Sequence, residues 1–361
     1  LKTMTKKEVY IVSAVRTPLG SFGGVFANMS ATKLGSIAIK GALEKANVNS
    51  QNIDEVFMGN VCSANLGQAP ARQSAIAAGI PYSVPCTTVN KVCSSGAKSI
   101  MFAAQSIMLG QADILVAGGM ENMSNVPYYV PKARFGYKYG NSELIDGLHK
   151  DGLLDPYDEI AMGVFADKTA EKYNISREEQ DAFAIRSYKN SEATTKSGIF
   201  KKEIIEVSIP QRKGNPIIVD EDEEYKNVKF EKIPQLRAAF SKDGTVTAAN
   251  ASTINDGASA LVLASADAVK TNLAHVGYKK GVPMGGDLAR APENTTISFL
   301  IAATRDPMGA NLDRIQVVKG WVDKAGSTHE KVYDVAWSNS EQRSIAKNGK
   351  LMSVGNTVDL D

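Results

Sequence analysis

A cysteine near residue 90 lies where its thiol could act as a nucleophile. Three residues separate Cys93 from the short run Cys-Thr-Thr-Val at residues 86–89, and Cys93 directly precedes residues 94–109, which are rich in Ala, Met and Ile. The first run is typical of a buried strand and the second of a helix, so Cys93 is predicted on the turn between them. Unpaired N–H groups and the helix dipole at such a turn favour a thiolate over a thiol. The position indicates a nucleophile, although a small buried apolar cysteine, the commoner kind, stays open as the alternative.

Alternating strand and helix patterns surround this turn and must position it. Strands are predicted over residues 8–14, 53–61 and 112–117, and helices over residues 31–46 and 69–78. Ser30 is predicted as the N-cap of the first helix. Such alternation is typical of an α/β fold with a mainly parallel sheet flanked by helices. Cys93 then lies near the carboxyl end of a strand, where open α/β sheets place their sites.

Residues 118–244 do not continue the alternation of strand and helix patterns and are predicted as an inserted loop domain. Helices are predicted over residues 160–172 and 176–197, and Ser176 with Glu179 forms a capping box at the start of the second. The acidic run at residues 219–224 is interpreted as a solvated loop. We therefore expect the α/β domain to comprise residues 1–117 and 245–270, with residues 118–244 between them.

The first pattern returns after residue 244. Residues 245–252 predict a strand and turn of small residues, residues 255–258 a second turn, and residues 258–264 a buried strand.

Composition argues against several classes of partner. The net charge is +2 over 361 residues, too small to indicate binding to nucleic acid or to a membrane surface. No apolar run approaches the roughly 20 residues of a membrane helix. The three cysteines lack disulfide or metal spacing, which indicates a reducing compartment, and the three histidines are isolated in sequence. We expect a cytoplasmic protein, or one of the mitochondrial matrix if a presequence has been removed.

Several motifs resemble those of one enzyme family. Residues 90–96, Asn-x-x-Cys-x-Ser-Gly, resemble the nucleophile motif of thiolases, which make or cleave acetoacetyl-CoA-type thioesters. Further similar stretches lie at residues 15–24, 59–61, 67–73, 117–124 and 250–258. The resemblance covers about residues 7–270.

This resemblance implies an acetyl-CoA C-acetyltransferase. Cys93 would carry an acyl-cysteine while two acetyl-CoA molecules form acetoacetyl-CoA and CoA, or while thiolysis runs in reverse. The coenzyme A thioester is then a substrate, and no tightly bound cofactor is expected. Matched residue by residue, the CoA-binding positions are Leu153, Met162, Tyr188, Asn227, Val228, Lys229, Lys232, Phe240 and Ser252. The family forms homodimers or homotetramers.

A potassium site is implied by the same resemblance. Tyr188, with Ala248, Ala249 and Ala251, resembles the potassium-binding group of the mitochondrial-type enzyme. The alternative is a plain turn, because another ligand comes from a part of the family fold that is not recognised here.

The last quarter of the chain departs from the family. The Gly-His-Pro, Cys-x-Gly-Gly-Gly and Asn-Glu-Ala-Phe motifs, which supply the activating histidine, the second cysteine and an oxyanion-hole asparagine, do not occur. Residues from about 276 to 361 resemble instead the tail of an uncharacterised bacterial, amidohydrolase-like family. β-rich segments are predicted there at residues 298–304, 314–321 and 331–337. Residues 271–361 would then be an unrelated segment that replaces the thiolase C-terminal domain.

Three hypotheses about function follow from the absence of these family motifs. We expect thiolase chemistry impaired by the loss of the second catalytic half. The alternative is a truncated or fused remnant that at most binds CoA, and a third, hydrolysis by the last segment, has no visible metal-ligand cluster behind it. A bare apolar face left by the missing half predicts self-association or aggregation.

Overall fold

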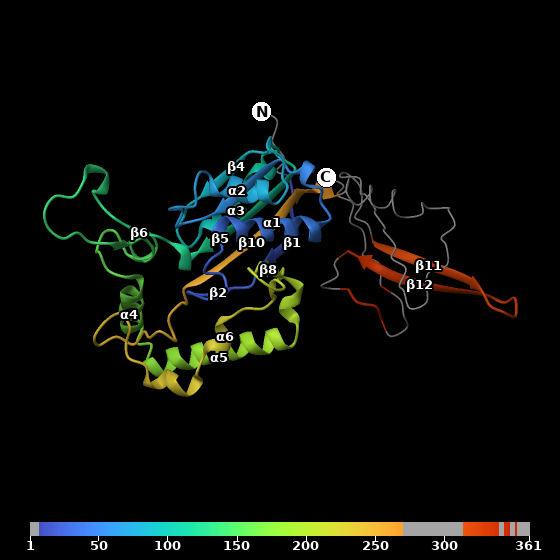
Figure 1. Cartoon of the computed structure of the whole chain (residues 1–361). Coiled ribbons are helices and arrows are strands. Elements are labelled where there is room, and N and C mark those ends of the chain that lie inside the picture. The colour runs from blue at the N-terminus through green and yellow to red at the C-terminus, as the bar shows by residue number, and fades with distance from the viewer. Residues whose placement is uncertain (1–6, 270–312, 339–342, 347–350, 352–361) are drawn as a thin grey trace, which may run out of the picture. The chain divides into compact units, whose positions relative to one another are not determined.

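The computed structural model of the chain describes residues 7–269, 313–338, 343–346 and 351. The chain divides into two compact units, Leu1–Ala274 and His275–Asp361. Each unit is described by itself (Figure 1). The predicted strand at residues 298–304 lies outside the described residues.

A six-stranded mixed sheet forms the centre of the first unit, in the order β1-β10-β5-β3-β4, with the short β2 paired to β10. Its strands are β1 (Val9–Arg16), β2 (Gly20–Ser21), β3 (Glu55–Gly59), β4 (Cys86–Val89), β5 (Ile114–Asn122) and β10 (Asn255–Ser265). β3 pairs in parallel with both β4 and β5, whereas β10 is antiparallel to β5, β1 and β2. Within this sheet β10 therefore runs against the other five strands, and the prediction of a mainly parallel α/β sheet is confirmed.

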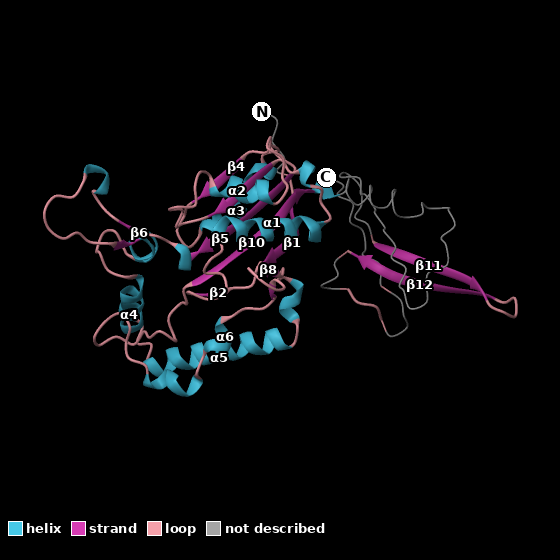
Figure 2. Cartoon of the chain, in the orientation of Figure 1, coloured by secondary structure: helices cyan, strands magenta, loops and turns pink. Residues whose placement is uncertain are grey.

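Helices cover both faces of this sheet (Figure 2). They are α1 (Ala31–Ala46) and α2 (Pro70–Ala77) on one face and α3 (Ser95–Met108) on the other. Alternate residues of β3 show the division, because Val56 and Met58 join the core under α1 and α2 while Phe57 joins the core under α3. This is the period of two expected of a strand buried on both faces.

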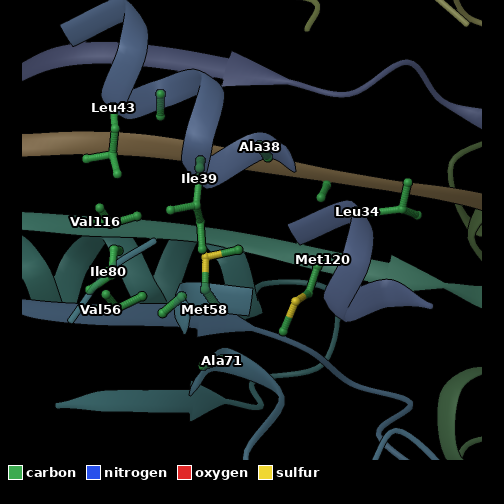
Figure 3. Close-up of a cluster of buried hydrophobic side chains, with 14 of the residues drawn as sticks. Leu34, Ala38, Ile39, Leu43, Val56, Met58, Ala71, Ile80, Val116 and Met120 are labelled. Atoms are coloured by element: carbon green, nitrogen blue, oxygen red, sulfur yellow. The ribbon is translucent and has the colours of Figure 1, made fainter. Parts of the chain in front are cut away.

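The larger core lies between α1 and the sheet (Figure 3). Leu34, Ala38 and Ile39 of α1 are fully buried, as are Val56 and Val116 below them. The helix begins as predicted, with the Ser30 hydroxyl accepting the Lys33 N–H at 3.2 Å. Its apolar residues recur at helical spacing on this one face, and their burial stabilises the packing of α1 on the sheet.

The chain between β5 and β10 forms small elements outside the sheet. They are β6 (Tyr128–Tyr129), β7 (Ile145–Asp146), a single-turn π-helix (His149–Leu153), α4 (Met162–Lys172), α5 (Arg177–Lys196), β8 (Val207–Ile209), β9 (Ile217–Val219), α6 (Glu224–Asn227) and four 3-10 turns, at Met123–Asn125, Ala133–Phe135, Ile199–Lys202 and Phe230–Gln235. The capping box of α5 is present, with Ser176 and Glu179 each bonded to the other's backbone N–H.

Three local predictions in this region are wrong. The acidic run is not simply a solvated loop, because Asp222 is buried and paired with Arg16, and the Glu223 carboxylate accepts the N–H groups of Ser21 and Val25. Residues 245–252 form turns without a strand, since hydrogen bonds within the loop replace a ladder. Residues 255–258, predicted as a turn, are the first residues of β10, because β2 and β5 pair with them.

The second unit contains an antiparallel hairpin of β11 (Arg314–Val322) and β12 (Thr328–Trp337). The predicted β-rich segments at residues 314–321 and 331–337 are confirmed. His329 shares a hydrogen bond of 2.8 Å with Asp323 and stacks on Trp321 with 5.2 Å between ring centroids. Both contacts suit a histidine that helps to order the hairpin turn.

Candidate active site

The turn that carries Cys93 is tied by its own side chains. β4 ends at Val89 and α3 begins at Ser95, so Cys93 lies on the predicted strand-to-helix turn. The Asn90 side-chain oxygen accepts the Val92 N–H at 3.0 Å, and the Ser95 hydroxyl donates to the Val92 carbonyl at 2.5 Å. Val92 has a φ of +50°, which is strained for a β-branched residue. The turn leaves Cys93 exposed, so the interpretation of Cys93 as a buried apolar cysteine is wrong.

A glycine on β3 lets the first turn of α3 come close to the sheet. A Cβ on Gly59 would lie 2.6 Å from the carbonyl carbon of Ser95 and 2.7 Å from the backbone nitrogen of Gly96. No side chain fits at that distance from another backbone. The absence of a side chain at residue 59 therefore sets the height of Cys93 above the sheet.

A pocket of about 250 Å³ opens beside Cys93. Its walls come from the carboxyl ends of β3 and β5, from the Cys93 turn and from the π-helix. The lining residues are Gly59, Asn60, Val61, Cys62, Val92, Cys93, Ser95, Gly96, Met120, Glu121, Met123, Gly152 and Leu153. Among the predicted site residues, this pocket brings together Cys93 and Leu153.

One glutamate holds the part of the wall that follows β3. Glu121 is at the end of β5, and its carboxylate accepts N–H groups of the Asn60 side chain at 3.0 Å, of Val61 at 2.9 Å and of Cys62 at 3.3 Å. Burial raises the pKa of Glu121, while these donors oppose the rise. The pocket wall therefore contains a carboxylate whose oxygens already accept hydrogen bonds from N–H groups of the protein.

A second cysteine lies in the same wall. Cys62 is buried, and burial together with the carboxylates of Glu121, Asp151 and Asp146 raises the pKa of its thiol to about 12. A Cβ on Gly152 would lie 3.2 Å from the Cys62 sulfur, so the π-helix packs tightly against it. Cys62 is a neutral thiol near neutral pH and forms an apolar part of the wall.

The other predicted CoA-binding residues lie outside this pocket, on α4, α5, α6 and the chain that follows. The aromatic ring of Phe240 packs on Gly163, the residue after Met162, so the start of α4 and the chain at residue 240 meet. α5 packs beside α6, and burial together with the Glu224 carboxylate raises the pKa of Tyr188 on α5. Asn227, Val228, Lys229, Lys232 and Ser252 lie at the end of α6 and in the chain after it. Asn227, Lys229, Lys232 and Ser252 are exposed and Val228 is partly buried.

The residues predicted to bind potassium lie on α5, which carries Tyr188, and on the loop at residues 247–251, which carries the three alanines. Asn250 bonds to Asp181 of α5 at 2.9 Å, and Asp181 is two helical turns from Tyr188. In the part of the chain that the structure describes, no hydrogen bond ends on the carbonyl oxygens of the three alanines, Ala248, Ala249 and Ala251. These carbonyl oxygens are therefore not engaged by donors of the described residues.

Comparisons with known proteins decide the family. The family model "Thiolase, N-terminal domain" matches residues 9–267. The chain belongs to the thiolase family. A second family model, described as a protein of unknown function (DUF3604), matches residues 259–361 of this thiolase-family chain.

Curated and solved relatives agree with that assignment. The chain is 55% identical to "Acetyl-CoA acetyltransferase, mitochondrial" of Homo sapiens, over 99% of this chain and 82% of the relative. It is 55% identical to "Acetyl-CoA acetyltransferase" of Schizosaccharomyces pombe, over 87% of this chain and 79% of the relative. The crystal structure of Acat5 thiolase from Ascaris suum in complex with coenzyme A is similar at a TM-score of 0.70 and 48% identity. That similarity covers 74% of this chain and 68% of the other.

These similarities confirm the predicted fold class and an acyltransferase of the thiolase family. The alignment with the human relative extends past residue 270, whereas the thiolase family model ends at residue 267. The division of this thiolase-family chain into domains stays a prediction. No helix in residues 7–269 or the later described segments is long and apolar enough to cross a membrane.

Sequence reasoning gave no role to Asn60, Cys62 or Glu121. All three lie at or just after the carboxyl ends of β3 and β5, as Cys93 follows β4. Because these strands are parallel neighbours, their ends meet at one edge of the sheet. Applying that rule to every predicted strand would have marked these strand ends as candidate positions, but it would not have shown that β3 and β5 are neighbours.

Proposed function

We propose that the chain transfers acyl groups through an acyl-cysteine at Cys93, with acetyl-CoA as the acyl donor. The observation that carries this proposal is the exposed Cys93 at the start of α3, beside a pocket that also contains Leu153. The Cys93 sulfur is the nucleophile that must attack the thioester. The relatives' names supply the substrate class.

The reaction has two half-reactions. The Cys93 sulfur bonds to the acyl carbon, and the bond to the CoA sulfur breaks, so that CoA leaves as a thiol once it takes up a proton. In the synthetic direction a second acetyl-CoA loses an α-proton and its carbanion bonds to the acyl carbon of the acyl-cysteine. The bond from that carbon to the Cys93 sulfur breaks, which frees the cysteine and gives acetoacetyl-CoA. Thiolysis is the reverse. The CoA would lie along Met162, Tyr188, Phe240 and the other matched residues of the chain between β5 and β10.

We further propose that turnover by this chain is slow. No histidine is among the described residues that line the pocket, and the titratable groups beside Cys93 are Cys62 and Glu121. Neither suits a base that must take a proton from Cys93, because the thiol is neutral and the carboxylate is occupied by three N–H donors. This observation also favours the alternative, a remnant that binds CoA without completing the cycle.

The decisive experiment is intact mass after incubation with isotopically labelled acetyl-CoA, followed by peptide mapping, with Cys93→Ala as the control. Label on Cys93 in the wild type alone is expected. CoA binding without label would support the binding remnant, and neither label nor binding would overturn the proposal. A thiolysis assay with acetoacetyl-CoA tests the rate, and turnover of about 1 per second or more would contradict slow turnover.

We propose a potassium ion at the carbonyls of Ala248, Ala249 and Ala251, with Tyr188 beside them. The ion would order the loop that carries Ser252. The midpoint of thermal unfolding should rise when KCl replaces choline chloride at equal ionic strength, and Tyr188→Phe should reduce that rise. Equal midpoints in both salts would show a plain turn.

We propose the cytoplasm as the compartment, with the mitochondrial matrix as the alternative. Both keep thiols reduced, which Cys93 needs as a nucleophile. Cell fractionation with an antibody to this chain separates the two.

A further inference from the structure

Two cysteines line one pocket but differ in state. Cys93 is exposed on the turn before α3, whereas Cys62 is buried on the turn after β3. An acyl group that enters the pocket therefore meets one sulfur that is available and one that is covered. The turn at residues 60–62 decides this difference, because it carries Cys62.

The turn at residues 60–62 has few hydrogen bonds within itself and is held mainly by hydrogen bonds to residues of β5. Asn60 donates to the carbonyl of Met120 at 3.1 Å, and its side-chain oxygen accepts the Ser63 hydroxyl at 2.6 Å. The Glu121 carboxylate accepts the N–H of Val61 and the N–H of Cys62. One side chain thus holds the backbone N–H groups of two consecutive residues that line the pocket.

We infer that Glu121 is a positioning residue that holds the turn at residues 60–62 as a closed wall of the acyl pocket, so that Cys93 is the sulfur that receives the acyl group. The part of this inference that concerns acyl transfer rests on the proposed function. The part that concerns the wall does not.

A carboxylate suits this task better than an amide. Both Glu121 oxygens accept, and all three of their partners are N–H donors. In Glu121→Gln, one acceptor becomes an NH₂ group that faces a donor, so at least one N–H in the wall loses its partner. Glu121→Asp keeps two acceptors but shortens the reach.

The experiment maps alkylation of each cysteine by iodoacetamide in the folded wild type, Glu121→Gln and Glu121→Asp. A matched control is Glu55→Gln, since Glu55 is a partly buried glutamate of β3 whose pKa burial also raises, but which lies outside the pocket. In Glu121→Gln we expect the alkylation rate of Cys62 to rise about tenfold or more, as loss of one buried charged hydrogen bond allows. The alkylation rate of Cys93 should change less than about twofold, because separate hydrogen bonds hold its turn. The alkylation rate of Cys62 in Glu121→Asp should lie between those of the wild type and Glu121→Gln, and the rate in Glu55→Gln should equal that of the wild type.

The second readout is acylation of Cys93 by labelled acetyl-CoA. We expect its rate to fall about tenfold in Glu121→Gln while alkylation of Cys93 persists. A merely structural role would lower both together or neither. Unchanged protection of Cys62 in a folded Glu121→Gln would overturn the inference.

Two outcomes keep the inference separate from the proposed function. If the wild type takes no acyl label, the proposed function fails, and the alkylation of Cys62 still decides the role of Glu121. If Glu121→Gln does not fold, hydrogen exchange of the wild type decides. The amides of Val61 and Cys62 should be protected as well as those inside β3, and rapid exchange at both would overturn the inference.

Discussion

Arg16 and Asp222 form a bidentate ion pair across 206 residues of chain, with distances of 2.7 and 3.0 Å between their nitrogen and oxygen atoms. The Arg16 guanidinium also bonds to Glu203 at 2.7 Å, and Asp222 accepts the Leu19 N–H at 2.9 Å. This network joins the end of β1 to the chain between β5 and β10, which carries most of the predicted CoA residues.

Removing Asp222 should destabilise the fold. Asp222→Ala leaves the Arg16 guanidinium partly buried without its main partner, so we expect the free energy of unfolding to fall by about 3 kcal/mol. Urea unfolding measures it. The control is Lys40→Ala, which breaks an exposed pair with Glu44 at 3.9 Å and should cost less than about 0.5 kcal/mol. Equal effects of the two variants would contradict the structural role of the network.

Gly59→Ala should displace the Cys93 turn. The new Cβ would meet the backbone of α3 at 2.6 Å, so either β3 or the first turn of the helix must shift. We expect a loss of about 1–3 kcal/mol in stability, typical of overpacking, and at least a tenfold fall in acylation of Cys93. In Gly96→Ala, by contrast, the nearest atom lies at 3.7 Å, an ordinary contact, so stability should be kept. Equal midpoints of thermal unfolding for Gly59→Ala and Gly96→Ala would show that the close approach at Gly59 is unimportant.

Alkaline pH should destabilise the protein partly through Cys62. The folded state raises the pKa of this thiol from 9.0 to about 12, so above pH 9 the unfolded chain releases a proton that the folded chain retains. The free energy of unfolding therefore falls as pH rises through this window. Cys62→Ala should show a shallower fall between pH 9 and 10.5 in chemical unfolding. Parallel curves for the two proteins would show that burial does not perturb this thiol.

The purified chain should self-associate. On α3, Met101 and Met108 lie two turns apart on one face and are 52% and 41% exposed, and the adjacent Leu109 is 57% exposed. Apolar side chains gathered this way favour association in water. Sedimentation velocity should show dimers or larger species, and Met101→Glu with Met108→Glu should reduce them. A monodisperse wild-type monomer with a cooperative melt would contradict this expectation.

Local chemistry made much of the first unit predictable. The Ser30 cap, the Ser176 capping box and the Cys93 turn follow from neighbouring residues, and the structure has all three. The acidic run could not be read in this way, because the partner of Asp222 is 206 residues away. The prediction of a turn at the start of β10 is wrong for the same reason, since the strands that pair with it are β2 and β5.

The candidate site was predictable in part. Cys93 has a local signal, a strand before it and a helix after it. Glu121 and Cys62 acquire their roles only when β3 and β5 are known to be parallel neighbours, which no spacing along the chain reveals. The matched CoA residues rest on resemblance, and the contacts around Met162 and Phe240 or around Tyr188 and α6 agree with it without testing it.

The place of β10 has a consequence for synthesis of the protein on the ribosome. β10 lies between β1 and β5, yet it is made last of the three, after the whole chain between β5 and β10. Until then β1, which exposes Tyr10, Ile11 and Val12 even in the finished fold, has no strand to pair with. At ordinary translation rates this interval is on the order of tens of seconds. We expect a nascent chain that needs chaperones which shield its first strand, and a yield in bacterial expression that depends on their supply.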